Sequence, residues 1–142
     1  MEVCEASVDL VFFDAANIAS LFRDMLSALE VVHKHDIVHL DIKPGNILLK
    51  DKRFKLCDFG MSLQTVNGYY SGDIDEGDSR YMAQELLDWE CSSDLRKCDI
   101  FSLGITGKRV PLKQREAERV IIHILLIYIY SMYNVLLSVI EI

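Results

Sequence analysis

The chain has 142 residues, which is enough for one domain with a hydrophobic core and too few for two. Its formal net charge of −7 at pH 7 argues against binding to phosphate backbones, so we expect no nucleic acid partner. The four cysteines form no CxxC pair, and no His stands at zinc-finger spacing, so they indicate reduced thiols. Since no basic segment precedes an apolar stretch at the start, we expect no secretory signal and a location in the nucleus or cytoplasm.

Apolar residues recur at three- and four-residue steps between Asn17 and Asp36. This spacing predicts an amphipathic helix with one buried face. The residues expected on that face are Ile18, Leu21, Phe22, Met25, Leu26, Leu29 and Val32.

Two short runs with β-like composition follow, Ile47–Leu49 and Phe54–Cys57. The charged link between them, Lys50–Arg53, predicts a small hairpin. The stretch Gln64–Asp78 is rich in Gly, Asp, Ser, Asn and Tyr without periodicity, which predicts a long loop of the functional kind. A further helix is expected around Asp99–Thr106.

The composition changes after Thr106, and residues 120–140 contain no Lys, Arg, Asp or Glu. Three interpretations of this tail, 107–142, stay open. The leading hypothesis is translated non-coding sequence, such as an unspliced intron, because A/T-rich DNA encodes Ile, Leu, Tyr and Lys. The second is a membrane helix over 120–140, which would place the protein at an intracellular membrane. The third is a helix of a soluble core.

The segment from His39 to Asn46, HLDIKPGN, fits the catalytic-loop pattern of protein kinases, and it is followed by Asp58-Phe59-Gly60. Each motif alone is weak, but the two in this order and spacing are specific. The residue types suit phosphoryl transfer, which needs a positioned hydroxyl, neutralised phosphates and held metal ions. The resemblance implies ATP and Mg²⁺ as cofactors.

The resemblance also implies a role for each of these residues. Asp41 would accept or orient the proton of the attacking hydroxyl, and Lys43 would face the transferring phosphate. Asn46 and Asp58 would hold Mg²⁺ through oxygen ligands. Structural roles are expected for the remaining motif residues, His39, Phe59 and Gly60.

Two later segments extend the resemblance. Tyr81–Glu85 is similar to the end of a kinase activation segment, and Asp99–Gly104 to the start of the central helix of the C-terminal lobe. Asp99 would then brace the backbone of the catalytic loop. Leu40 in place of the usual Arg, and EGDSRYMAQELL over Glu76–Leu87, resemble the Wee/Myt family, which phosphorylates and inhibits cyclin-dependent kinases.

Leu40 has a consequence for regulation. An Arg at this place usually pairs with a phosphate on the activation loop, so we expect activity here without that phosphate. The loop hydroxyls are then ordinary polar groups and not switches; they are Tyr69, Tyr70, Ser71 and Ser79. Lys43 is typical of serine/threonine kinases, whereas the family targets tyrosine, with threonine added in the Myt branch; we follow the family.

The expected fold is therefore α+β: a mainly α kinase C-terminal lobe over residues 1–106, with a small β-hairpin. The sequence has no GxGxxG loop, and Glu2–Glu5 resembles the hinge between lobes, so we expect the N-terminal lobe to be absent. Glu85 normally pairs with a later Arg, and no later segment resembles that region. The alternative to an active kinase is an inactive fragment that serves only as a binding module.

Overall fold

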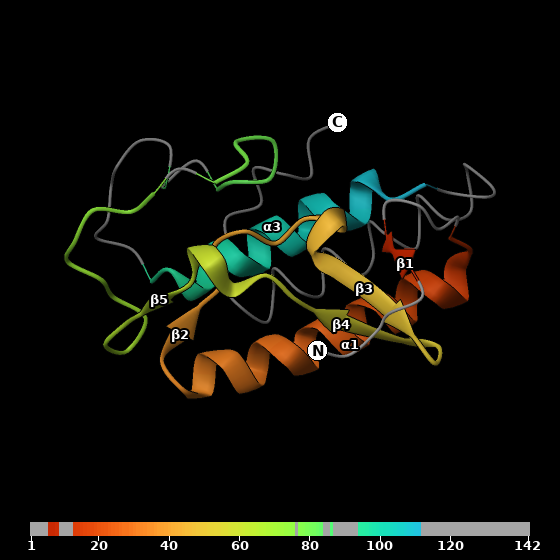
Figure 1. The fold of residues 1–142 in the computed structure, drawn as a ribbon, viewed down its shortest axis with the longest axis horizontal. Coiled ribbons are helices and arrows are strands. Elements are labelled where there is room, and N and C mark those ends of the chain that lie inside the picture. The colour runs from red at the N-terminus through yellow and green to blue at the C-terminus, as the bar shows by residue number, and fades with distance from the viewer. Residues whose placement is uncertain (1–5, 9–12, 76, 84–85, 87–93, 112–142) are drawn as a thin grey trace.

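A computed structural model describes residues 6–8, 13–75, 77–83, 86 and 94–111 (Figure 1). The elements in chain order are β1 (Ala6–Ser7), α1 (Ala15–Lys34), β2 (Ile37–Val38), η2 (Pro44–Asn46), β3 (Ile47–Lys50), β4 (Arg53–Leu56), η3 (Phe59–Met61), β5 (Leu63–Gln64) and α3 (Arg96–Arg109). Two helices and two small antiparallel sheets thus make up the described part of the chain, which agrees with the α+β expectation.

Helix α1 begins where Asp14, in extended conformation, accepts a hydrogen bond from the backbone N–H of Asn17 at 2.9 Å. This cap satisfies one of the amide donors that a helix start leaves unpaired. Five of the residues expected on the buried face lie in the core, namely Ile18, Leu21, Phe22, Met25 and Leu29. The helix predicted from the spacing is confirmed, with both ends shifted toward the N-terminus.

The predicted hairpin is β3 and β4, which pair from Ile47 opposite Leu56 to Lys50 opposite Arg53. Asp51 and Lys52 between them both have positive φ, 48° and 60°, as a two-residue type I′ turn requires. The hairpin is not isolated, because β1 pairs with β3 and makes a three-stranded sheet. The predicted loop from Gln64 onward also begins inside a strand, since β5 pairs with β2.

The main hydrophobic core lies between α1, α3 and the β3–β4 hairpin, as Figure 1 shows. A buried carboxylate joins two of these elements: Asp24 on α1 accepts a hydrogen bond from the backbone N–H of Phe54 on β4 at 3.0 Å. An Arg53 guanidinium nitrogen lies 3.2 Å from the same carboxylate. These contacts hold the β3–β4 hairpin against α1. They therefore also position the residues at the end of the hairpin opposite its turn, before β3 and after β4.

Helix α3 begins before and ends after the predicted range and continues past Thr106 to Arg109. Gly107 lies against α1, because a Cβ built on it would stand 2.3 Å from Cζ of Phe22. Val110 also belongs to the main core. The expected boundary after Thr106 therefore falls inside a packed helix.

Some predictions concern residues outside the described part of the chain: the hinge-like segment 2–5, Glu85 and the tail segment 120–140. Within the described part, no helix is both long enough and apolar enough to cross a membrane.

Candidate active site

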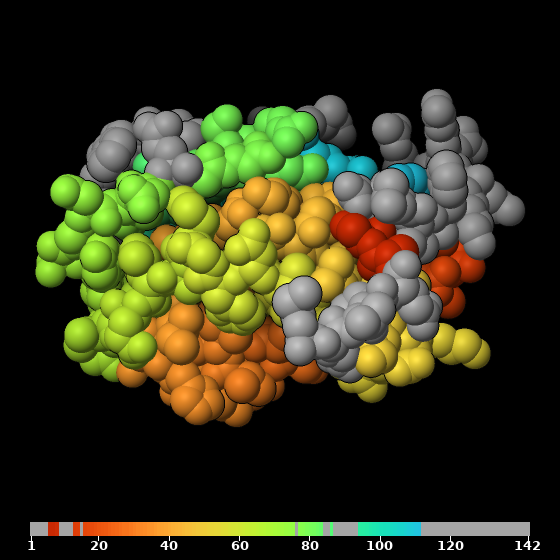
Figure 2. Space-filling view, in the orientation of Figure 1, coloured from red at the N-terminus to blue at the C-terminus, as the bar shows by residue number. Residues whose placement is uncertain are grey.

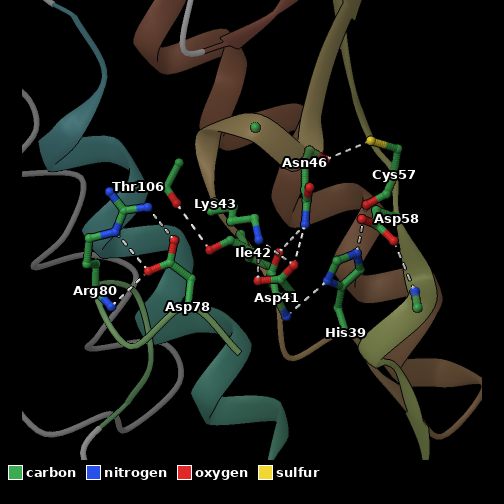
Figure 3. A network of polar contacts seen from close by, with 12 residues as sticks. His39, Asp41, Ile42, Lys43, Asn46, Cys57, Asp58, Asp78, Arg80 and Thr106 are labelled. Atoms are coloured by element: carbon green, nitrogen blue, oxygen red, sulfur yellow. Dashed lines mark hydrogen bonds and ion pairs between the residues drawn. The ribbon is translucent and has the colours of Figure 1, made fainter. Parts of the chain in front are cut away.

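The open end of the β3–β4 hairpin brings the two sequence motifs together. Asn46 immediately precedes β3 and Cys57 immediately follows β4, and the backbone N–H of Cys57 donates to the Asn46 carbonyl at 3.0 Å. The Cys57 thiol lies 3.3 Å from the same carbonyl oxygen. The pairing register of one hairpin therefore places Asp58 beside the residues of the first motif (Figure 3).

His39 joins the two motifs a second time. Its side chain is fully buried, with Nε2 lying 3.0 Å from the Cys57 carbonyl oxygen. The backbone N–H of Asp41 donates to Nδ1 at 3.3 Å, so Nδ1 is an acceptor. The neutral tautomer with its proton on Nε2 satisfies both contacts at once. His39 thus holds the backbone of Asp41 against the residue that precedes Asp58.

Asp41 is the centre of the polar network drawn in Figure 3. The Lys43 ammonium donates to both oxygens of its carboxylate, at 3.0 and 2.8 Å. The Asn46 amide nitrogen donates to the carboxylate at 2.7 Å and to the Asp41 carbonyl at 2.8 Å. Three of the predicted site residues are therefore in direct contact, and the carboxylate accepts from one charged and one neutral donor.

Asn46 and Asp58 have the right chemistry for a magnesium site. Because the Asn46 amide nitrogen is used by Asp41, the amide oxygen is the group that offers lone pairs to a cation. Asp58 adds a carboxylate on an exposed, left-handed backbone position with φ of 62°. Mg²⁺ is commonly bound by one or two such side chains together with substrate phosphates. Among the described residues, no group of three or more His, Cys, Asp or Glu could hold a metal ion.

Phe59 and Gly60 form the short helical turn that follows Asp58. The Phe59 ring packs edge-on against the His39 ring, with centroids 4.8 Å apart, and remains 47% exposed. The backbone N–H of Gly60 donates to the Asp58 carboxylate at 3.3 Å, which orients it. Phe59 therefore contributes an aromatic contact to the catalytic loop and an apolar surface on the outside of the site.

Asp99 on α3 has no solvent exposure and accepts three hydrogen bonds. The backbone N–H groups of His39 and Leu40 donate at 2.9 and 2.8 Å, and His33 Nε2 lies 2.8 Å away. Leu40 has a positive φ of 63°, a conformation that a bulky residue adopts only when its surroundings impose it. Asp99 supplies that constraint, so helix α3 determines the path of the catalytic loop.

The structure adds residues that the sequence patterns did not assign. Asp78 and Arg80 form an ion pair at 2.6 Å, on the opposite side of Asp41 from Asp58 (Figure 3). The hydrogen bond from Arg80 lowers the pKa of the Asp78 carboxyl to about 2, and the charge of Lys43 acts in the same direction. Gly77 lies over the site, since a Cβ on it would stand 3.7 Å from Oδ1 of Asp41. All three residues belong to the EGDSRYM motif, but the motif alone does not show that Gly77 lies against Asp41.

Two further contacts come from the helices. The Thr106 hydroxyl on α3 lies 3.5 Å from the Ile42 carbonyl oxygen, and His33 on α1 holds Asp99. No spacing rule could have found His33, because its partner is 66 residues away in the sequence. Of the predicted site residues, only Glu85 lies outside the described part of the chain.

Comparisons with known proteins show which family the sequence matches. The protein kinase domain family matches residues 2–124. A Wee1-like protein kinase of Arabidopsis thaliana is 44% identical over 61% of this chain and 16% of that protein. A membrane-associated tyrosine- and threonine-specific cdc2-inhibitory kinase of Drosophila melanogaster is 38% identical over 74% of this chain and 20% of that protein.

A second kinase with that description, wee-1.3 of Caenorhabditis elegans, is 42% identical over 61% of this chain. The chain spans 13% to 20% of the length of these three relatives. The family match nevertheless covers both motifs, the activation segment and α3. The chain therefore belongs to the protein kinase family, with kinases of the Wee/Myt branch among its relatives.

Proposed function

We propose that these residues form the catalytic part of a protein kinase that transfers the γ-phosphoryl group of ATP to a hydroxyl of a protein. The observation that carries the proposal is the network around Asp41, in which Lys43 and Asn46 both contact its carboxylate. The hairpin register adds Asp58 at the same place. A purely binding module has no need for this arrangement of ionised and metal-binding side chains, so the enzymatic role is favoured.

Each side chain has a distinct part in the proposed reaction. Asp41 orients the acceptor hydroxyl and accepts its proton as the hydroxyl oxygen bonds to phosphorus and the bond to ADP breaks. Lys43 moves from Asp41 toward the transferring phosphate and balances its charge. Asn46 and Asp58 would hold Mg²⁺, which would supply positive charge to balance the phosphate oxygens.

The proposed acceptor is a tyrosine or threonine of a cyclin-dependent kinase. The support is similarity to relatives described as tyrosine- and threonine-specific cdc2-inhibitory kinases. We place the protein in the nucleus or cytoplasm. Membrane association through residues 120–140 stays a second possibility, on a segment that lies outside the described residues.

Protein kinases hold the phosphates of ATP with a glycine-rich loop, and no GxGxxG pattern occurs in these 142 residues. The test uses a kinase domain in which this chain follows the N-terminal lobe of a Wee/Myt relative. Asp58→Ala should lower phosphate transfer to a cyclin-dependent kinase at least about 100-fold, because a direct metal ligand is lost.

Asp73→Ala, which also removes an exposed carboxylate, is the matched control and should retain activity. The measurement is radiolabelled phosphate transfer from ATP at saturating Mg²⁺. Full activity in the Asp58→Ala variant would rule out the proposed metal site.

A further inference from the structure

The activation segment contains a tight turn whose two central residues both have positive φ, Asn67 at 53° and Gly68 at 87°. Val66 and Tyr69 on either side exchange two backbone hydrogen bonds, at 2.9 and 3.1 Å. An Asn-Gly pair is the sequence that favours this type I′ turn. The turn therefore has a defined shape and presents its backbone carbonyls as a rigid unit.

Those carbonyls bind to the beginning of helix α3. The backbone N–H of Leu95, the cap residue of the helix, donates to the Gly68 carbonyl at 2.9 Å. The Arg96 guanidinium donates to the Asn67 carbonyl at 3.0 Å. The contact satisfies a donor at a helix start, where amide groups otherwise lack partners.

A carboxylate fixes the guanidinium that makes this contact. Arg96 donates through Nε and Nη2 to Asp94, at distances between 2.7 and 3.1 Å. Burial raises the pKa of the Asp94 carboxyl, but the hydrogen bonds and charge of Arg96 lower it more, so the net shift is downward. The pair thus stays ionised near neutral pH, and a two-point contact of this kind holds the guanidinium in one orientation.

Only glycine fits at the contact. A Cβ on Gly68 would stand 2.0 Å from Oδ1 of Asp94 and 2.7 Å from Nε of Arg96. Both atoms belong to side chains that make the ion pair, and the φ of 87° at Gly68 strains any other L residue whatever space is made. The close approach of the turn to the helix therefore depends on the missing side chain.

The same helix also fixes the catalytic loop. Asp99 accepts the backbone N–H groups of His39 and Leu40, as described above. The Leu40 side chain belongs to a buried cluster with Ile74 of the activation segment and Leu95 of the helix cap. An arginine at position 40 would pair with a phosphate on the activation loop, whereas Leu40 packs against apolar side chains instead.

We infer that the contact of the Asn67–Gly68 turn with Asp94, Leu95 and Arg96 is a latch that holds the activation segment in register with the catalytic loop without phosphorylation. Gly68 and Arg96 are then positioning residues for the protein acceptor. They act through the activation segment and do not touch the reacting atoms. In Figure 1 the start of α3 lies near the loop that follows β5, in agreement with the hydrogen bonds that Leu95 and Arg96 make to it.

Hydrogen exchange on the 142-residue chain tests the latch directly, independently of catalysis. Gly68→Ala should raise amide exchange over residues 65–75 and 77–83 about tenfold or more, while exchange over α1 stays unchanged. Gly45→Ala is the matched control, because a Cβ on Gly45 meets nothing within 4 Å. Unchanged exchange over 65–83, or an equal rise over α1, would overturn the inference.

A kinetic experiment tests the positioning role, and this arm rests on the proposed function. In the kinase domain that carries an N-terminal lobe, Gly68→Ala and Arg96→Gln should raise KM for the protein acceptor about tenfold and leave KM for ATP within about twofold. The KM of Arg96→Lys for the protein acceptor should lie between those of the wild type and Arg96→Gln. A lysine ammonium can donate to the Asn67 carbonyl, but it cannot also make the two-point contact with the Asp94 carboxylate.

The two arms separate the two claims. If KM rises equally for the protein acceptor and for ATP, or rises for neither, the positioning role is wrong. Exchange that responds to Gly68→Ala in the 142-residue chain, together with no phosphate transfer by the wild-type kinase domain that carries an N-terminal lobe, would support the latch and overturn the proposed function.

Discussion

At the scale of single residues, the site depends on buried polar groups whose partners come from distant parts of the chain. The Asp99 side chain is fully buried and accepts hydrogen bonds from the backbone N–H groups of His39 and Leu40. Leu40 keeps a left-handed backbone that costs on the order of 1–3 kcal/mol. The hydrogen bonds to Asp99 therefore offset a local strain as well as satisfying buried donors.

Asp99→Ala should destabilise the chain by about 2–5 kcal/mol, because it leaves two buried donors without a partner and releases His33. Asp75→Ala, at an exposed position, should change the free energy of unfolding by less than about 0.5 kcal/mol. Urea unfolding followed by far-UV circular dichroism measures both. If Asp99→Ala lowers the free energy of unfolding by less than about 1 kcal/mol, the catalytic loop does not depend on this carboxylate.

At the scale of elements, each motif is positioned by a regular structure that the sequence patterns already indicated. The β3–β4 hairpin sets Asn46 beside Cys57, and α3 holds both the catalytic loop and the activation segment. In the space-filling view, the green segment that follows β5 spreads over one side of the face that shows the catalytic loop (Figure 2). The position of the activation segment therefore depends on its contacts with α3 and with the buried cluster around Leu40.

The loop hydroxyls should accordingly have little effect on activity. Tyr69→Phe and Ser79→Ala should each change phosphate transfer by less than about twofold in the kinase domain with an N-terminal lobe, since Leu40 offers no charge for a phosphate. Both side chains are exposed, so neither substitution should disturb packing. A large loss from either one would show that activity requires phosphorylation of the activation segment after all.

The hairpin turn offers a test that is independent of catalysis. Lys52 adopts a left-handed φ of 60° in a type I′ turn, where glycine is the preferred residue. Lys52→Gly should therefore stabilise the chain, by about 0.5 kcal/mol after the entropy cost of glycine is subtracted. Lys55→Gly within β4 is the contrasting variant and should destabilise it. If thermal unfolding shows that both variants lose stability, the turn assignment is wrong.

At the scale of the whole molecule, Asp58, Phe59 and Gly60 form an exposed surface of the candidate site. Phe59 remains 47% exposed although it belongs to a motif at the centre of the site. Packing of this phenylalanine is one of the features that sets the activity of a kinase. Phe59 therefore leaves an apolar surface open on the outside of the site.

We accordingly predict that the 142 residues by themselves have no measurable kinase activity. Catalysis of this type is mainly positioning and electrostatic stabilisation, and Asn46 and Asp58 can act only when the phosphates of ATP are already held. Each 1.4 kcal/mol of lost binding lowers ATP affinity about tenfold, so we expect little ATP to bind to residues that contain no GxGxxG loop for its phosphates. Radiolabelled transfer by the purified chain, with Asp58→Ala as the control, measures this. Transfer that depends on Asp58 would contradict the prediction.

The sequence by itself determined the elements and the chemistry of the motifs. Local patterns sufficed for α1 and the hairpin, because periodicity and turn composition act within a few residues. The order of HLDIKPGN and Asp58-Phe59-Gly60 was enough to indicate the family. The ends of α3 were missed because its buried surface includes glycine, serine and threonine, which give a weak apolar pattern.

Only the tertiary structure decided which side chains meet. His33 and Asp99, Asn67 and Arg96, and Gly77 and Asp41 are far apart in the sequence, and nothing in their spacing indicates a contact. Such contacts depend on how α1, α3 and the hairpin pack around one core, and packing is a property of complementary surfaces that no local pattern encodes. The sequence therefore showed the chemistry that this chain carries, and the fold showed how the activation segment and the catalytic loop are held on the same helix.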